Sequence, residues 1–212
     1  DTFQIWQRAE ITALFAADVD LTALMLDLYQ QQIEADSIEI NYLEQGDWVD
    51  RWQRSLEPID CGGGLWICPD AEQRPAGAAT IVRLRPGMAF GTGSHPTTAM
   101  CLAWLAEQSA WSKCRVLDFG CGSGILAIAA AKLGAAAVTA TDIDPDALGV
   151  CAANVGDNGL DDVVIVLREA LHCRPYDVVV ANVLLEPLID EFATMVECTA
   201  PGSRIAMSGI LV

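Results

Sequence analysis

The stretch Val116-Leu117-Asp118-Phe119-Gly120-Cys121-Gly122-Ser123-Gly124 decides the fold of this chain. An apolar run enters a glycine-rich turn, and an apolar helical pattern from Ile125 to Leu133 follows directly. A second apolar run, Ala135–Ala140, ends in Asp142. Glycines alone serve any tight turn, but glycines followed by a carboxylate at the end of the next strand are typical of a nucleoside-binding βαβ unit. Such a carboxylate can accept both hydroxyls of a ribose.

The spacing of the glycines favours S-adenosylmethionine over a dinucleotide. A dinucleotide fingerprint reads G-x-G-x-x-G/A, and Gly120 and Gly122 match it, but Ile125 occupies the third position. A branched side chain there obstructs the close helix–strand packing that the dinucleotide turn needs. Because the chain instead reads G-x-G-x-G through Gly124, the loop can enclose a ligand without a pyrophosphate, with Asp142 on its ribose.

Two polar residues at the ends of expected strands are candidates for further roles. Asp118 could orient the glycine loop or face the amino group of the ligand. Asn182 follows the expected strand 177–181, and its amide offers an acceptor and a donor at one point. It could aim a methyl-accepting amine, or it could cap the next helix. Leu184 and Leu185 stand where enzymes acting on planar bases tend to carry an aromatic residue, so an aliphatic amine is the favoured acceptor.

The segment Phe90-Gly91-Thr92-Gly93-Ser94-His95-Pro96-Thr97-Thr98 leads into another expected helix. A helix start presents unpaired N–H groups to anionic ligand atoms such as a carboxylate. Read alone, the segment is better explained as a helix N-cap with a surface loop, and His95 as an exposed or hydrogen-bonded residue. If the segment instead reaches the ligand, the expected cofactor contacts are Phe90, Gly91, Thr97 and Thr98.

Strands and helices alternate from residue 86 to the end, which predicts an α/β fold with a doubly wound parallel sheet. The expected strands cover residues 115–119, 137–141, 163–167, 177–181 and 204–208, and the helices 96–108, 124–133, 145–155 and 186–198. A strand pair, 65–68 and 78–84, precedes them. We expect three regions: a partial α+β, ferredoxin-like substrate-recognition domain (1–46), a linker helix (47–60), and the catalytic domain (61–212).

Composition narrows the class of partner. The chain of 212 residues holds 12 basic and 29 acidic residues, a net charge of −17. This charge argues against a nucleic-acid backbone and suits a basic protein partner, or solubility alone. Eight cysteines without a C-x-x-C pair indicate buried thiols in a reducing, cytoplasmic compartment. The distant His95 and His172 predict no metal site, and no apolar stretch reaches the length of a membrane span.

The chain resembles the PrmA family, methyltransferases of large-subunit ribosomal protein eleven. The matching motifs occur in the family's order from residue 47 to the end, and the GTGSHPTT segment is the most specific of them. They are Asp47-Trp48-Val49 with Trp52, Leu65-Trp66-Ile67-Cys68-Pro69, Pro86 to Thr98, Asp118 to Ala129, Asp142-Ile143-Asp144-Pro145, Val180-Ala181-Asn182 and Ser208-Gly209-Ile210-Leu211.

The resemblance implies a Rossmann-like class I methyltransferase fold with S-adenosylmethionine as methyl donor. It implies that lysine and α-amino nitrogens of a basic ribosomal protein are the acceptors, and that a leading domain grips this protein. It assigns cofactor contacts to Thr98, Gly120, Asp142 and Asn182. Among these we expect Asn182 to be the catalytic residue, because its amide could orient the amine. The family fold also continues beyond residue 212 into a closing strand pair, so we expect this chain to lack the last strands.

Three other readings remain open on the residues. They are an NAD-dependent oxidoreductase, an N-methyltransferase acting on another protein or a nucleic acid, and an inactive ribosome-associated binding module. The chain also departs from the family pattern after Asn182, where it reads Val183-Leu184-Leu185-Glu186 in place of Ile-Leu-Ala-Gly. Glu186 therefore bears on which acceptor is chosen.

Overall fold

The structure is a computed structural model that describes residues 57–69, 74–84, 95–108, 111–169 and 175–209. The expected domain 1–46 and residues 47–56 of the expected linker lie outside these ranges. Every described residue belongs to the compact unit of residues 49–212.

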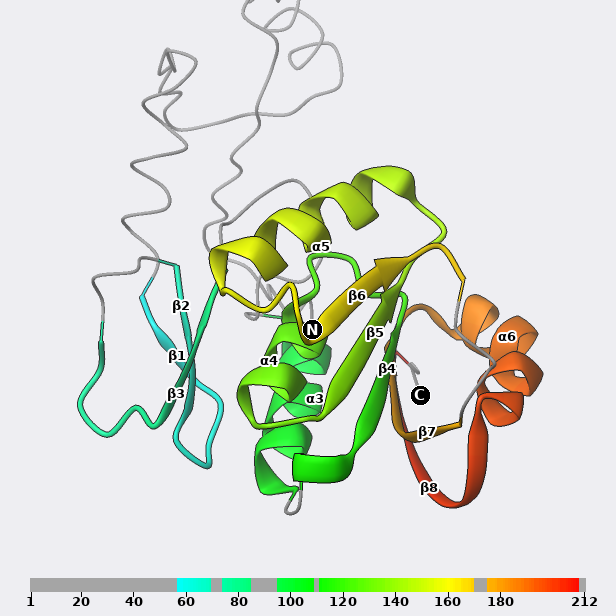
Figure 1. The fold of residues 1–212 in the computed structure, drawn as a ribbon, viewed down its shortest axis with the longest axis horizontal. Helices are drawn as coiled ribbons and strands as arrows, with labels where there is room; N and C mark the ends of the chain where they lie inside the picture. The colour runs from blue at the N-terminus through cyan, green and yellow to red at the C-terminus, as the bar shows by residue number, and fades with distance from the viewer. Residues whose placement is uncertain (1–56, 70–73, 85–94, 109–110, 170–174, 210–212) are drawn as a thin grey trace, which may run out of the picture. The chain divides into compact units, whose positions relative to one another are not determined.

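A five-stranded parallel sheet forms the centre of this unit (Figure 1). Its strands are β4 (Arg115–Phe119), β5 (Ala137–Thr141), β6 (Val164–Leu167), β7 (Tyr176–Asn182) and β8 (Thr199–Ser208). They lie in the order β6-β5-β4-β7-β8, so the order reverses between β4 and β7. The predicted doubly wound sheet is confirmed. At such a reversal the loops after the two central strands diverge and leave room for a ligand.

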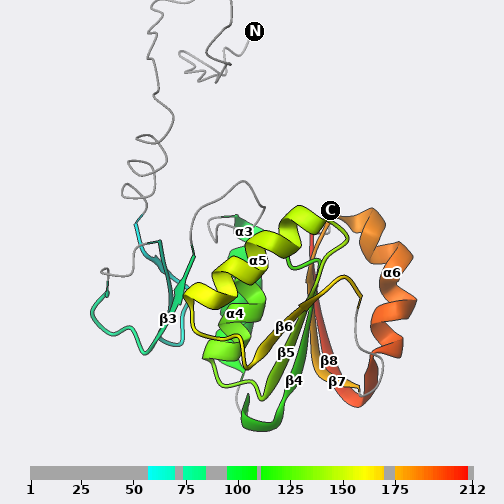
Figure 2. The same cartoon turned by 45° about the horizontal axis from the view of Figure 1, so that its top comes forward.

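Helices cover both faces of the sheet (Figures 1 and 2). On one face lie α3 (Pro96–Glu107), α4 (Ile125–Lys132) and α5 (Pro145–Asp157), and on the other lies α6 (Leu185–Glu197). A short 3₁₀ turn, Trp111–Lys113, leads into β4. Each strand contributes side chains to the apolar core on both faces of the sheet, because successive side chains point to opposite faces. Val116 packs with α3 and α4, whereas Leu117 packs with α6.

The ends of two helices carry recognisable sequence signals. Asp144 accepts a hydrogen bond from the Asp146 N–H at 2.9 Å and caps α5. Gly134 follows α4 with φ +106°, and the Ala135 N–H returns to the Ala130 carbonyl at 3.1 Å, which closes the helix. The start of α6 at Leu185, one residue before the predicted start, has no side-chain cap.

Strand β8 begins earlier than residue 204, where the sequence predicted it. Thr199 already pairs with Tyr176, and the register then shifts so that Arg204 pairs with Val178. The Pro201-Gly202 turn therefore bulges out within the strand instead of preceding it. Ser203 stabilises the bulge, since its hydroxyl donates to the Tyr176 carbonyl at 2.8 Å and accepts from the Ala200 N–H at 3.0 Å.

A second, three-stranded sheet packs beside α3 and α4. Its strands are β1 (Ile59–Asp60), β2 (Leu65–Cys68) and β3 (Thr80–Arg83), in the order β1-β2-β3. The expected strand pair is β2 with β3, which run parallel, and β1 lies inside the stretch expected as linker. Leu65, Ile67 and Val82 join one core cluster with α3 and α4.

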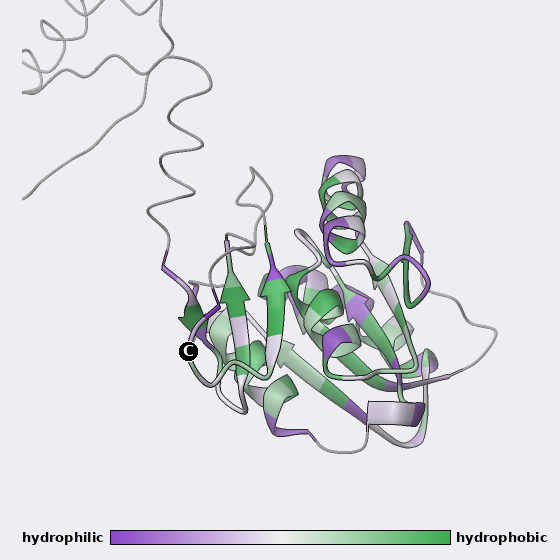
Figure 3. Ribbon diagram, turned by 60° about the vertical axis from the view of Figure 1, so that its left-hand side comes forward, coloured by the Kyte–Doolittle hydropathy of each residue, from purple (hydrophilic) through white to green (hydrophobic). Residues whose placement is uncertain are grey.

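Helix α4 is consequently buried on all sides. Its seven residues from Ile125 to Ala131 are all at most 8% exposed. The largely green strands of Figure 3 show the same concentration of apolar residues at the centre. Within the described ranges, no helix combines the length and the apolar character that crossing a bilayer requires.

Candidate cofactor and methyl-transfer site

The glycine loop between β4 and α4 has no room for side chains at two positions. Gly120 and Gly124 have φ of +70° and +78°, a region that favours glycine. A Cβ on Gly120 would lie 2.2 Å from Val183 Cγ1, and one on Gly124 would lie 2.5 Å from Cys151 Sγ. Gly122 also has a positive φ, +51°. The loop is thus shaped by its own dihedral angles and by neighbours on both sides.

Asp142 holds this loop from the end of β5. Its Oδ2 accepts the Gly122 N–H at 2.9 Å, and its Oδ1 accepts the Asp144 N–H at 3.0 Å. The Cys121 N–H donates in addition to the Thr141 carbonyl at 2.8 Å. A carboxylate has about four lone-pair sites, so half-buried Asp142 can hold the loop and still accept hydroxyls. Its position fits the role on a ribose.

Asp118 lies beneath the loop and is only 1% exposed. Its Oδ2 accepts the Ala127 N–H at 2.9 Å, which ties the first turn of α4 to β4. No donor among the described residues reaches the buried Oδ1. Burial, and to a smaller degree repulsion from Asp142, raises the pKa of Asp118 to about 7, against the Ala127 hydrogen bond, which lowers it. The carboxyl group thus anchors the start of α4 to β4 beneath the glycine loop.

Asn182 and Thr98 meet although 84 residues separate them in sequence. The Asn182 Nδ2 donates to the Thr98 Oγ1 at 3.0 Å, and the Thr98 side chain is completely buried. Asn182 does not cap α6, because Leu184 is the cap residue. The alternative of a helix cap is therefore wrong. The bond to Thr98 uses only the amide nitrogen, so the carbonyl oxygen of Asn182 is available as an acceptor beside the glycine loop.

His95 and Thr97 form the beginning of α3. His95 is the N-cap, and its Nδ1 accepts the Thr97 N–H at 3.3 Å and lies 2.7 Å from the Thr97 hydroxyl. The interpretation of this segment as a helix cap is confirmed, with His95 as the cap residue, and Thr97 is half-buried. Phe90 and Gly91 lie outside the described residues. No group of three or more metal-ligating side chains occurs in the part of the chain that the structure describes.

The sequence analysis did not single out two residues that the structure places at the carboxyl ends of the strands. Ile143 is 84% exposed directly after Asp142, just beyond the carboxyl end of β5. Val183 fills the space against Gly120. The position of Ile143 between two aspartates, beyond the end of a strand, was a signal that it does not belong to the core.

The reversal of strand order, the glycine loop after β4 and the carboxylate after β5 together define a class I methyltransferase, an enzyme that uses S-adenosylmethionine as methyl donor. The sequence profile described as "Ribosomal protein L11 methyltransferase (PrmA)" matches residues 1–212. The chain belongs to this family.

Individual relatives agree with this assignment. The ribosomal protein L11 methyltransferase of Teredinibacter turnerae is 41% identical over 210 residues, which are 98% of this chain and 70% of the relative. That of Ectopseudomonas mendocina is 43% identical over 215 residues, 99% of this chain and 73% of the relative. A crystal structure of the ribosomal protein L11 methylase from Lactobacillus delbrueckii subsp. bulgaricus superposes with a TM-score of 0.64 at 33% identity, covering 73% of this chain and 81% of the other.

Proposed function

We propose that the protein transfers methyl groups from S-adenosylmethionine to lysine and α-amino nitrogens of ribosomal protein L11. The relatives' names support the target protein. The hydrogen bond between Asn182 and Thr98 carries the proposal for the reaction, because it fixes a polar amide at the reversal of strand order, beside the glycine loop.

We assign the cofactor contacts to the residues around that loop. When bound, S-adenosylmethionine supplies an electrophilic methyl group on a positively charged sulfur. The Asp142 carboxylate would hold the ribose, and Oδ1 of Asp118 would accept an N–H of the amino group of the methionine part. The backbone of Gly120, Gly122 and Gly124 would border the ligand. Thr98 belongs to the same set, with Phe90, Gly91 and Thr97 as the expected contacts that precede it.

Asn182 is the proposed catalytic residue. Its carbonyl oxygen accepts an N–H of the target amine, so that the nitrogen lone pair points toward the methyl group. A lysine amine has a pKa near 10.4 in water, and only the neutral amine has a free lone pair. A desolvated position close to a positive charge favours the neutral form of the amine. Most of the rate acceleration would then come from orientation and proximity.

The net charge of −17 supports a basic target protein over direct contact with nucleic acid. The thiols support a reducing compartment, the cytoplasm, because Cys61, Cys101, Cys121 and Cys151 are buried and form no disulfide. Burial raises the pKa of both Cys61 and Cys101 to about 11, so these thiols are unreactive at neutral pH.

The test measures transfer of a labelled methyl group to purified L11 by the Asn182→Ala variant. We expect turnover to fall about a hundredfold, because the amine loses its orientation. The dissociation constant for S-adenosylmethionine should change much less. Unchanged turnover on L11 would contradict the role of Asn182.

Thr98 provides a matched pair of variants. Thr98→Val removes the acceptor of the Asn182 amide and keeps the shape of the side chain, whereas Thr98→Ser keeps the hydroxyl. We expect the valine variant to lose turnover and the serine variant to retain most of it. Equal turnover in both would show that the hydrogen bond does not position Asn182. Titration with NADH, for which we expect no binding, separates the proposal from an oxidoreductase.

A further inference from the structure

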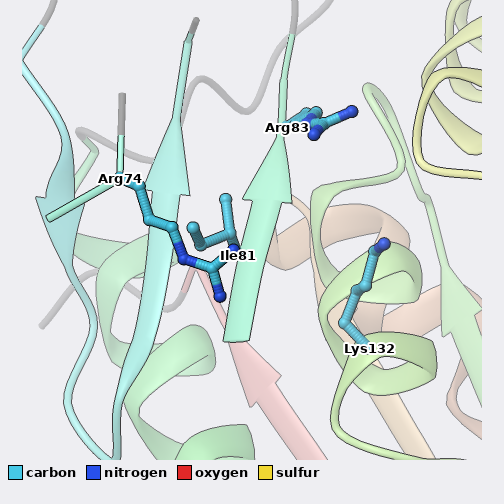
Figure 4. A pocket seen from close by; sticks show the side chains of 4 residues that line it. All are labelled: Arg74, Ile81, Arg83 and Lys132. Atoms are coloured by element: carbon cyan, nitrogen blue, oxygen red, sulfur yellow. The ribbon is translucent and has the colours of Figure 1, made fainter. Parts of the chain in front are cut away.

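A cleft of about 240 Å³ lies away from the glycine loop, and three of the four residues that line it are cationic (Figure 4). They are Arg74, Arg83 and Lys132, and the fourth is Ile81. Ile81 and Arg83 lie on β3, and Lys132 is the last residue of α4. Because α4 has eight residues and begins beside Gly124, the cleft lies about 12 Å along the helix from the glycine loop.

Asn158 fixes two of the cationic residues relative to each other. Its side chain accepts the Arg83 N–H at 3.0 Å and donates to the Arg83 carbonyl at 2.7 Å. Its backbone carbonyl accepts from Lys132 Nζ at 2.9 Å. Asn158 itself is only 7% exposed. One buried residue, Asn158, therefore fixes both strand β3 and the ammonium group of Lys132 at this cleft.

The charges in this cleft lack a partner among the residues that line it. All three charged lining residues are positive, in a chain with only 12 basic residues and a net charge of −17. Burial, and then repulsion from Arg83, lowers the pKa of Lys132. The ammonium group of Lys132 has three N–H donors and uses one of them for the Asn158 carbonyl, so two remain for another acceptor. An anion in the cleft would relieve this repulsion and satisfy these donors.

We infer that this cleft binds the phosphate group of a small phosphorylated ligand, an activity beyond the proposed methyl transfer. Guanidinium groups present parallel N–H donors that match the oxygens of a phosphate, and an ammonium adds a compact third charge. The side chains of Arg74 and Arg83 are exposed and supply such donors at the rim, while half-buried Lys132 lies deeper.

The size and the surroundings of the cleft favour a compact phosphate over a polynucleotide. Pockets for whole cofactor-sized ligands have volumes of roughly 300–1,000 Å³, so this cleft fits a phosphate with few attached atoms. A nucleic-acid backbone requires an extended basic surface, and it would be repelled by the net charge of the chain.

The experiment follows backbone amide NMR shifts of the whole chain during titration at constant ionic strength. The probes are inorganic phosphate and glycerol 3-phosphate, with glycerol and chloride as controls. We expect both phosphates to cause saturable shifts at Arg83 and Lys132, and glycerol to cause none. Saturation by inorganic phosphate alone would show that the cleft binds the free ion. Tighter binding of glycerol 3-phosphate than of inorganic phosphate would show that it binds a phosphate monoester.

Charge-removing variants supply the second arm. Arg83→Gln and Lys132→Gln should each weaken phosphate binding about tenfold, since each removes charge-assisted hydrogen bonds. Arg168→Gln removes an equal charge at an exposed position outside the cleft and should leave binding unchanged. All three variants should keep methyl transfer to L11, which separates this proposal from the proposed function.

Three results would overturn the inference. The first is a shift that grows linearly with phosphate and never saturates. The second is an equal loss of binding in Arg168→Gln, which would show general charge attraction. The third concerns a short RNA without terminal phosphates. If it shifts the same amides at a lower concentration of phosphate groups than either small phosphate needs, the cleft would be assigned to a polynucleotide.

Discussion

Single residues at this site combine a structural task with the ligand contact proposed for them. Asp142 and Asp118 each use one oxygen to hold the glycine loop or the helix that follows it. For Asp118 the arrangement has an energetic cost, because a carboxylate is buried there with one oxygen that no described donor reaches. The site therefore retains a buried acceptor that stabilises the folded state poorly until a donor arrives.

This burial predicts a pH dependence of stability. The pKa of Asp118 is raised from 3.8 to about 7 in the folded protein, so the folded state binds this proton more tightly than the unfolded state. Its contribution to stability is complete below pH 3.8 and is lost as the pH rises through 7, by up to about 4 kcal/mol. Urea unfolding at a series of pH values should show this loss in the wild type and not in Asp118→Asn.

The exposed residue Asp162 provides the control for that measurement. Asp162→Asn removes a carboxylate without touching the buried site, so it should keep the wild-type pH dependence. An unchanged pH dependence in Asp118→Asn would show that the buried carboxyl group does not cause it.

At the scale of elements, the loop after β7 is wedged between the glycine loop after β4 and the end of β8. The side chain of Val183 contacts Gly120 in the glycine loop, and its carbonyl contacts Gly209 at the end of β8. A Cβ on Gly209 would lie 2.0 Å from the Val183 carbonyl oxygen. Val183 directly follows Asn182, so the ends of β4, β7 and β8 set the position of the proposed catalytic residue together.

This wedge predicts different outcomes for two glycine substitutions. Gly120→Ala clashes with a side chain, so adding Val183→Ala should restore part of the lost cofactor binding and turnover. Gly209→Ala clashes with a backbone oxygen, so the same second substitution should not restore turnover. Some loss should remain in both, because alanine is strained at φ of +70° and +102°. Equal rescue of both variants would contradict the wedge.

The elements differ in how well the sequence predicted them. Local signals were sufficient for the parallel sheet, the glycine loop and the helix that follows Asp144, since each depends on neighbouring residues. The hydrogen bond of Asn182 to Thr98 could not be derived, because tertiary packing brings these residues together from distant segments. The bulge in β8 was missed for a related reason. The sequence predicted a strand from residue 204, and only the pairing of Thr199 with Tyr176 shows that the strand begins before the Pro201-Gly202 turn.

For the molecule as a whole, the charge of −17 should govern how fast a basic target is met. Because salt screens this attraction, kcat/KM for L11 should fall as ionic strength rises, while kcat at saturating L11 stays nearly constant. Steady-state kinetics in increasing concentrations of potassium chloride would measure this. A kcat/KM that does not respond to salt would exclude electrostatic steering.

The complete enclosure of α4 between the two sheets has a consequence for hydrogen exchange. An amide in this helix meets water only when the whole unit unfolds, so the backbone protons of Ile128 to Ala131 should be among the slowest to exchange for deuterium. Those of α6, which exposes Ile189, Phe192 and Val196, should exchange sooner through local opening. Since α4 directly follows Gly124, its N-cap, the glycine loop proposed to hold the cofactor is anchored to the part of the protein expected to open last.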